Sequence, residues 1–173
     1  MDFFELYDAR ARADEPIELP LRDQRTGEII TMGGKPCIVL VLGANARSIP
    51  PDAKAAMLKE EKAEQPIRDR LHAACMRAAL AYIAGFKNMA RRGEDGEAIP
   101  LTLDDAEAFL DLNVASVEHG AWRAPKRNEG ETDEEYRQRV DQDRAVWRGA
   151  SFAQQILDAS REESRFLDRP RGN

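Results

Sequence analysis

The chain has 173 residues and a mass of 19.4 kDa, which fits a single compact domain. Its formal net charge is −6 and its pI is about 5.1, so Lys and Arg are too few overall for a protein that binds nucleic acid by neutralising phosphates. A hydrophobic fraction of 42% beside 34% charged residues argues against disorder throughout and predicts a modest core with charged helix faces.

The same sequence gives no reason to expect a membrane partner or a disulfide framework. It does not open on a charged-then-apolar leader, and its longest apolar run, Cys37 to Leu42, is far too short to cross a bilayer. The two cysteines, Cys37 and Cys75, lie far apart in the sequence. We therefore expect a cytoplasmic protein with reduced thiols.

The first part of the chain predicts a small β unit. Apolar residues alternate from Ile17 to Leu21, and Glu28–Met32 makes a second strand after a turn-rich segment. After Gly33-Gly34, the β-branched run Pro36–Gly43 indicates a third strand that is covered on both faces. Together the three strands would form an antiparallel meander with the first strand at its edge, because Pro20 cannot donate a ladder hydrogen bond.

Beyond residue 48 the composition turns to Ala, Glu, Lys and Arg, which predicts a mainly α-helical body. A charged helix is expected over 52–65, ended by Pro66. The next helix is expected from Ile67 to about Arg92, because six apolar residues keep a spacing of three and four. These residues are Ile67, Leu71, Cys75, Ala78, Tyr82 and Phe86. A flexible loop is expected over 93–100.

Capping signals predict three further helices. Thr102 and Asp105 form a capping-box-like pair before a helix that runs toward Val117, and Thr132 with Glu135 opens another. In the first of these helices four residues are expected to face inward and two more to continue the apolar pattern toward Val117. They are Leu103, Ala106, Phe109 and Leu110, followed by Leu112 and Val114. The last helix is expected to start near Ala150 or Ser151.

The predicted fold is therefore α+β, with a small N-terminal antiparallel β meander followed by a mainly α-helical body. The β subdomain would span residues 1–48 and the helical body residues 49–173, together forming one compact unit. The β part is too small to hold a core alone, so it must pack on a helix or on another protein.

The residue types and spacings of a catalytic centre are not recognisable. No serine lies in a G-x-S-x-G turn, and Gly33-Gly34-Lys35 lacks the spacing of a phosphate loop, so a turn between strands is the better interpretation. We expect no catalytic residue, no cofactor and no metal. One alternative is a small enzyme or ligand-binding domain built on His72, Cys75 and His119, although two neighbours on a helix do not close a zinc site.

The surface offers the better candidates for function. Trp122 lies in a polar loop, and the last helix is amphipathic, with Phe152, Ile156 and Phe166 on its apolar face. These four residues are our candidate contacts with a partner protein. The alternative for each is packing in the chain's own core.

Several stretches of the chain carry a family resemblance. They are the turn Thr26-Gly27-Glu28, the segment Tyr82–Phe86, the loop Asp95–Pro100 running into Leu101–Leu110, and the closing helix Ser151–Ser160. Their order resembles the tail assembly chaperones of long-tailed bacteriophages and related prophage or gene-transfer elements. The likeness spans most of the chain, and its most specific part is Pro100–Leu110.

This resemblance implies a non-catalytic protein of the host cytoplasm. Its partner would be the phage tape measure protein, which it keeps from aggregating while tail tube protein subunits are recruited around that protein. The alternative is a structural virion component, such as a head-tail connector or a tail completion protein. Self-association is left open by the sequence.

Overall fold

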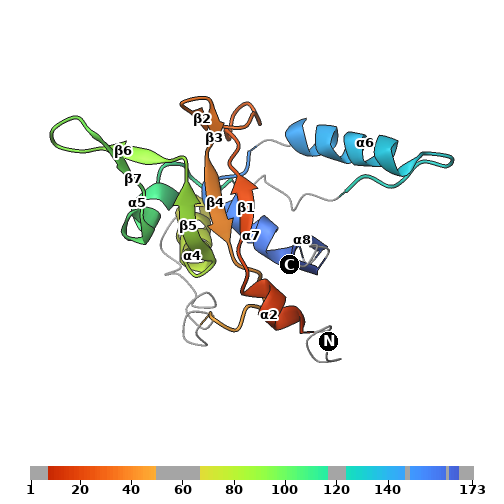
Figure 1. Ribbon diagram of the computed structural model, residues 1–173, viewed down its shortest axis with the longest axis horizontal. Helices are drawn as coiled ribbons and strands as arrows, with labels where there is room; N and C mark the ends of the chain where they lie inside the picture. The colour runs from red at the N-terminus through yellow and green to blue at the C-terminus, as the bar shows by residue number, and fades with distance from the viewer. Residues whose placement is uncertain (1–7, 50–66, 117–123, 147–148, 163, 168–173) are drawn as a thin grey trace, which may run out of the picture.

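The computed structural model describes residues 8–49, 67–116, 124–146, 149–162 and 164–167. Its centre is a three-stranded antiparallel sheet in the order β1-β4-β5 (Figure 1). The strands span Ile17–Pro20 (β1), Ile38–Val41 (β4) and Ile83–Lys87 (β5). β1 lies at an edge, as the proline at its end predicts.

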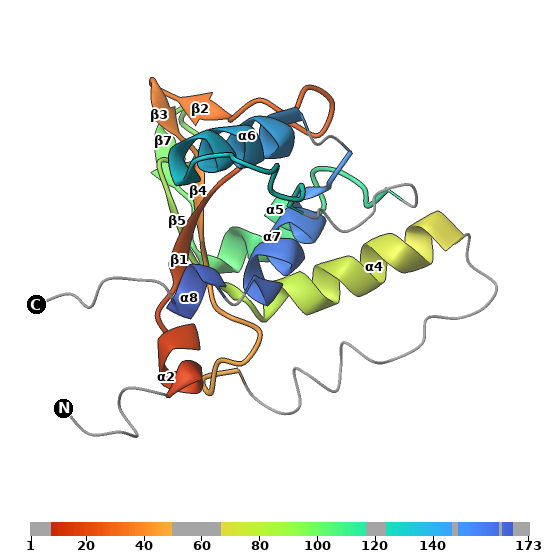
Figure 2. The ribbon, with the colours of Figure 1, turned by 90° about the vertical axis from the view of Figure 1, so that its right-hand side faces the viewer.

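Helices cover one face of this sheet. Figure 2 shows α4 (Ile67–Leu80), α5 (Ala106–Leu110) and α7 (Phe152–Arg161) on the same side of the strands. Side chains alternate between the two faces of a strand, and Val39 and Val41 of β4 are both fully buried. Their neighbours in the core include Ile156 of α7.

The predicted fold class is wrong. β1 pairs with β4 instead of residues 28–32, which contribute an isolated bridge between Arg22 and Ile29. β5 comes from the C-terminal part of the helix predicted over 67–92. The chain therefore does not fold as a β meander followed by a helical body; it is a mixed α/β fold with several small antiparallel sheets.

The helix predicted to reach Arg92 ends at Leu80 because the next residues complete the sheet. The Tyr82 N–H donates to the Ala79 carbonyl at the end of α4, and the Leu42 N–H donates to the Tyr82 carbonyl. Residues four apart share a face in a helix and also in a strand, so the spacing of Tyr82 and Phe86 fits both. Residues 83–87 form a strand because they pair with the edge of β4.

Two short hairpins extend from the sheet region. In the first, β2 (Thr31–Met32) pairs with β3 (Lys35–Pro36), and Gly33 and Gly34 have φ of 56° and 76°, as the predicted turn requires. In the second, β6 (Ala90–Arg92) pairs with β7 (Ala98–Pro100). The flexible loop predicted over 93–100 is instead the turn and second strand of this hairpin.

The three helix starts predicted from capping signals are confirmed. The Thr102 N–H donates to Asp105 Oδ2 at 2.9 Å, at the start of η1 (Leu103–Asp105), which leads into α5. Thr132 and Glu135 bond each other reciprocally at the start of α6 (Asp133–Val146). Ser151 caps α7. Two shorter helices, α2 (Ala9–Ala13) and α8 (Ser164–Leu167), lie near the ends of the chain.

The helix predicted to run from Thr102 toward Val117 is shorter than expected. α5 ends at Leu110, and Ala106, Phe109 and Leu110 are buried as predicted. Leu103 and Leu112 are not inward: their exposed fractions are 56% and 72%. The prediction for these two residues is wrong because the α-helical periodicity does not extend through η1 or past Leu110.

Residues from both predicted parts of the chain contribute to one hydrophobic core. Its buried members include Ile17 and Val39 from the predicted β part, and Ala79, Leu110 and Ile156 from the predicted helical body. The predicted boundary after residue 48 therefore does not separate two cores. The helix predicted over 52–65 falls outside the described residues. Within the described part, the helices are all too short or too polar to cross a membrane.

Candidate protein-binding groove

An apolar groove of about 340 Å³ opens between the β2–β3 hairpin, the junction of β5 and β6, and α5. We call it the α5 groove. Its lining comes from segments that lie far apart in the sequence. The lining residues are Leu21, Ile30, Met32, Cys37, Met89, Ala90, Arg91, Leu101, Asp105, Ala108, Phe109, Leu112 and Phe152.

Aromatic rings support the inner side of the groove. Phe109 stacks on Phe152 with ring centroids 5.0 Å apart and an interplanar angle of 7°. Phe86 meets Phe109 edge to face at 5.2 Å and 73°. Such ring pairs have defined geometry and bury large apolar areas. They hold α5, α7 and β5 together behind the groove.

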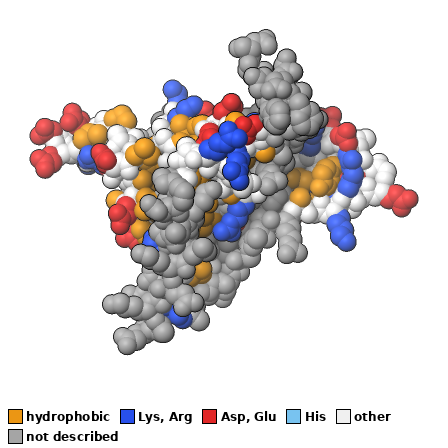
Figure 3. All heavy atoms as spheres, turned by 90° about the horizontal axis from the view of Figure 1, so that it is seen from below, with side chains coloured by type: hydrophobic (Ala, Val, Ile, Leu, Met, Phe, Trp, Pro, Cys, Tyr) orange, Lys and Arg blue, Asp and Glu red, His pale blue; other side chains and the backbone are white. Residues whose placement is uncertain are grey.

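The rim of the groove carries apolar side chains that are exposed to solvent. Leu112 is 72% exposed and Met32 is 45% exposed, and both line the groove. On the left of Figure 3, where Figure 1 places β6, β7 and α5, hydrophobic and acidic side chains lie side by side. Contiguous apolar surface of this kind marks interaction sites, and methionines such as Met32 and Met89 adapt to irregular partners.

The charged residues of the lining pair with each other. Arg91 Nε lies 3.0 Å from Asp105 Oδ1. The hydrogen bond from the Thr102 N–H, together with the Arg91 guanidinium, holds the pKa of Asp105 below its ordinary value. This ion pair leaves the lining without a net charge.

One wall of the groove continues into the loop 111–116, and His72 of α4 holds this loop at two points. His72 Nδ1 accepts the Ala115 N–H at 3.3 Å, and Nε2 lies 2.9 Å from Asp111 Oδ1. A neutral imidazole with its proton on Nε2 makes both bonds at once. His72 is therefore engaged in fixing the loop that carries Leu112.

The start of α7 holds the other half of the loop. Gln154 Oε1 accepts the Ser116 N–H at 3.3 Å, and its Nε2 donates to the Ser116 carbonyl at 3.0 Å. Asn113 Oδ1 accepts the Phe152 N–H at 2.8 Å. These side-chain bonds hold the chain beyond the last helical hydrogen bonds, which the Asp111 and Leu112 N–H groups donate to the Glu107 and Phe109 carbonyls. The loop and the groove wall are thus preorganised.

The opposite wall is fixed by backbone hydrogen bonds between three segments. The Leu21 N–H donates to the Cys37 carbonyl, the Cys37 N–H to the Ile30 carbonyl, and the Ile30 N–H to the Leu21 carbonyl, each at 2.9 Å. The Leu101 N–H donates to the Met89 carbonyl at the same distance. These main-chain groups already form hydrogen bonds within the protein. The groove therefore presents side chains to a ligand.

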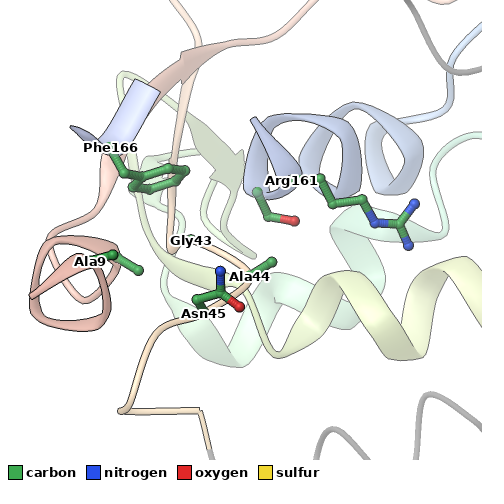
Figure 4. A pocket seen from close by; sticks show the side chains of 8 residues that line it. Ala9, Gly43, Ala44, Asn45, Arg161 and Phe166 are labelled. Carbon is green, nitrogen blue, oxygen red and sulfur yellow. The ribbon is translucent and has the colours of Figure 1, made fainter. Parts of the chain in front are cut away.

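A second, smaller pocket of about 260 Å³ lies between α2, α8 and the loop after β4 (Figure 4). A Cβ atom on Gly43 would lie 2.8 Å from the Ala13 Cβ, so the chain passes very close to α2 here. The Arg161 side chain extends away from Phe166 and Gly43 (Figure 4). The residues drawn there do not converge on a reacting centre.

The predicted partner contacts lie in different surroundings. Phe152 lines the α5 groove and is partly buried. Ile156 is fully buried and Phe166 is 4% exposed, so both pack in the chain's own core. Trp122 lies outside the described residues. A partner-binding role for these residues stays a prediction, and Phe152 is the one with access to the groove.

The set His72, Cys75 and His119 is not brought together as a described site, since His119 lies outside the residues that the structure describes. Cys37 and Cys75 are free thiols, and burial raises the pKa of each, which disfavours the reactive thiolate. Among the described residues, His, Cys, Asp and Glu side chains form no group of three that could hold a metal ion.

Local sequence patterns do not identify the exposed apolar residues of the groove rim. Periodicity places Leu112 on a continuing helix face and gives no separate signal for Met32. The local signal available for Leu112 was its neighbour Asn113, a residue that favours caps and turns over helix interiors. The partners that hold the loop, His72 and Gln154, are distant in sequence.

Comparisons with known proteins place no relative beside this chain. No protein-family model matches it, and searches of curated proteins and of solved structures find no match.

Proposed function

We propose that the protein is a tail assembly chaperone that binds the tape measure protein of a long-tailed phage and helps tail tube subunits assemble around it. The sequence resemblance motivates this function. The observation that carries it is the preorganised apolar groove with Leu112 and Met32 exposed at its rim. Such a surface is suited to covering apolar side chains of another protein.

The physical demand of the task agrees with these features. A long helical protein that is free of its tube exposes an apolar seam and aggregates. A chaperone with a moderate apolar site covers part of that seam reversibly, and its net charge of −6 adds repulsion between complexes. Since Arg91 and Asp105 pair with each other, the groove favours apolar contact over acid–base chemistry.

Co-expression tests the proposed function. A phage tape measure protein is expressed with this protein or with its Leu112→Asn variant, and the soluble tape measure protein is quantified. We expect the unsubstituted protein to raise the soluble yield severalfold and Leu112→Asn to lose most of that gain, because burying a leucine contributes about 1.5–3 kcal/mol. Leu103→Asn is the matched control, since Leu103 is 56% exposed but lies outside the groove lining. An unchanged yield with the unsubstituted protein would contradict the function.

The protein composition of finished phage particles distinguishes a chaperone from the alternative, a structural component of the virion. A chaperone leaves the particle and is absent or far below stoichiometric in mass spectra of purified phage. A connector or completion protein would instead appear in the copy number of a ring.

A further inference from the structure

The surroundings of the α5 groove are predominantly acidic. Asp104, Glu107 and Asp111 are exposed, and each stands one position before a residue that lines the groove. We call these three residues the acidic stripe. The next positions along the chain, Asp105, Ala108 and Leu112, line the groove. The acidic stripe therefore runs beside the apolar one.

The turn of the β6–β7 hairpin adds to this charge. Glu94, Asp95 and Glu97 are all exposed in that turn. In Figure 3 acidic side chains gather at the left end of the molecule, with hydrophobic side chains beside them. Arg91, the basic residue of the lining, is paired with Asp105 and does not offset the stripe. A partner segment would meet apolar surface flanked by carboxylates.

The walls of the groove also select the form of the ligand. A strand added to a sheet edge needs free main-chain groups, but those of Leu21, Ile30 and Cys37 bond one another. A small polar molecule needs converging polar groups to orient it, but Arg91 and Asp105 of the lining bond each other. Apolar side chains projecting from a helix match a groove of side chains.

We propose that the α5 groove holds the apolar face of an amphipathic helix that carries Lys or Arg beside that face. The apolar side chains enter between Met32, Leu112 and Phe152, and the basic side chains lie against Asp104 and Glu107. This inference rests on the proposed function and specifies the chemistry of the partner segment.

Two synthetic peptides test the charge preference. Both are amphipathic helices of about 18 residues, long enough to be helical in water. They share the same leucine face, and their polar positions are Lys in one and Glu in the other. Fluorescence anisotropy measures their affinity for the full chain at low and moderate salt. We expect the lysine peptide to bind at least about tenfold more tightly, with the difference shrinking as salt screens the charges.

Three variants locate the binding. Leu112→Asn and Met32→Gln should each weaken the lysine peptide about tenfold, and because both residues are exposed, the fold should survive. Asp104→Asn with Glu107→Gln should weaken it about threefold and reduce the salt dependence. Leu103→Asn is the control that should change nothing. Circular dichroism verifies that each variant is folded.

Equal affinity for both peptides, with the loss on Leu112→Asn retained, would overturn the charge preference and leave the proposed function standing. If Leu112→Asn and Met32→Gln both leave the affinity for the lysine peptide unchanged, the groove is not the binding site. If the lysine peptide binds as expected while co-expression fails to raise the soluble partner, the proposed function fails and the groove's preference for basic helices stands.

Discussion

Buried and half-buried polar side chains set the path of the loops around the groove. Gln155 is an example: its Oε1 accepts the Arg22 N–H at 3.0 Å and its Nε2 donates to the Arg22 carbonyl at 2.9 Å, so that a side-chain amide completes the backbone bonding of a residue 133 positions away. Gln154 does the same for Ser116. Two adjacent glutamines thus tie α7 to two distant segments.

At this residue scale, His72 is the position whose loss we expect to matter most for the groove. His72→Ala removes the acceptor of the N–H of Ala115, a fully buried residue, and the donor to Asp111. We expect a loss of about 1–3 kcal/mol in the free energy of unfolding, measured by urea denaturation, and faster amide exchange at Ala115. Asp111→Asn is the comparison, because Asp111 is 69% exposed and its change should cost less than about 0.5 kcal/mol. An unchanged exchange rate at Ala115 in His72→Ala would contradict the assigned role.

At the scale of the elements, α6 is held by contacts with the loop that precedes it. Tyr136 of α6 donates to the Pro125 carbonyl at 3.1 Å, and the guanidinium groups of Arg127 and Arg139 lie 5.3 and 5.7 Å from the centre of its ring. Arg139 also bonds both carboxylate oxygens of Glu131, at 2.7 and 2.9 Å. The loop before α6 is therefore folded back on the helix, which Figure 1 shows extending to one side of the sheet.

The pairing of Glu131 with Arg139 gives this element a defined pH dependence. The hydrogen bond from Arg139, followed by that from the Asn128 N–H, lowers the pKa of Glu131 from 4.5 to about 2. A carboxylate with a depressed pKa stabilises the folded state fully above pH 4.5 and loses that contribution as the pH falls toward 2. Carbon NMR of the Glu131 carboxyl should show it still charged at about pH 3.5.

Arg139→Gln is the matched variant for this titration. Without the guanidinium, the Glu131 midpoint should move up toward 4.5. A midpoint near 4 or above in the unsubstituted protein would show that the bidentate pair does not form in solution.

For the whole molecule, the shared core makes the sheet and its covering helices one unit. Cys37 is 3% exposed and belongs to the same buried cluster as Val39, Ala79 and Ile156. Elements that share one continuous core depend on each other's packing, so we expect them to unfold in a single cooperative step. The N-terminal strands and the helices behind them should therefore be lost together.

Thiol labelling tests this cooperativity. In a Cys75→Ser variant, Cys37 reports the opening of the β1–β4 region, while far-ultraviolet circular dichroism reports the helices. We expect the two probes to have the same midpoint in urea. Labelling of Cys37 at lower urea, with the helical signal intact, would instead reveal a separately unfolding β part.

Local sequence determined the features that depend on neighbouring residues. The capping pair Thr132 and Glu135 and the cap Ser151 begin their helices where their side chains can bond the first free N–H groups. The Gly33-Gly34 turn follows from glycine's access to positive φ. The strands β1 and β4 follow from short apolar and β-branched patterns.

Tertiary structure decided the features that depend on distant partners. Residues 83–87 form a strand because β4 offers an edge, and α5 stops at Leu110 where bonds from His72 and Gln154 take over the backbone of the following loop. The α5 groove combines residues from Leu21 to Phe152, so local periodicity does not reveal it. Periodicity and caps encode an element's face and its start, whereas pairing across long sequence separations fixes its end and its neighbours.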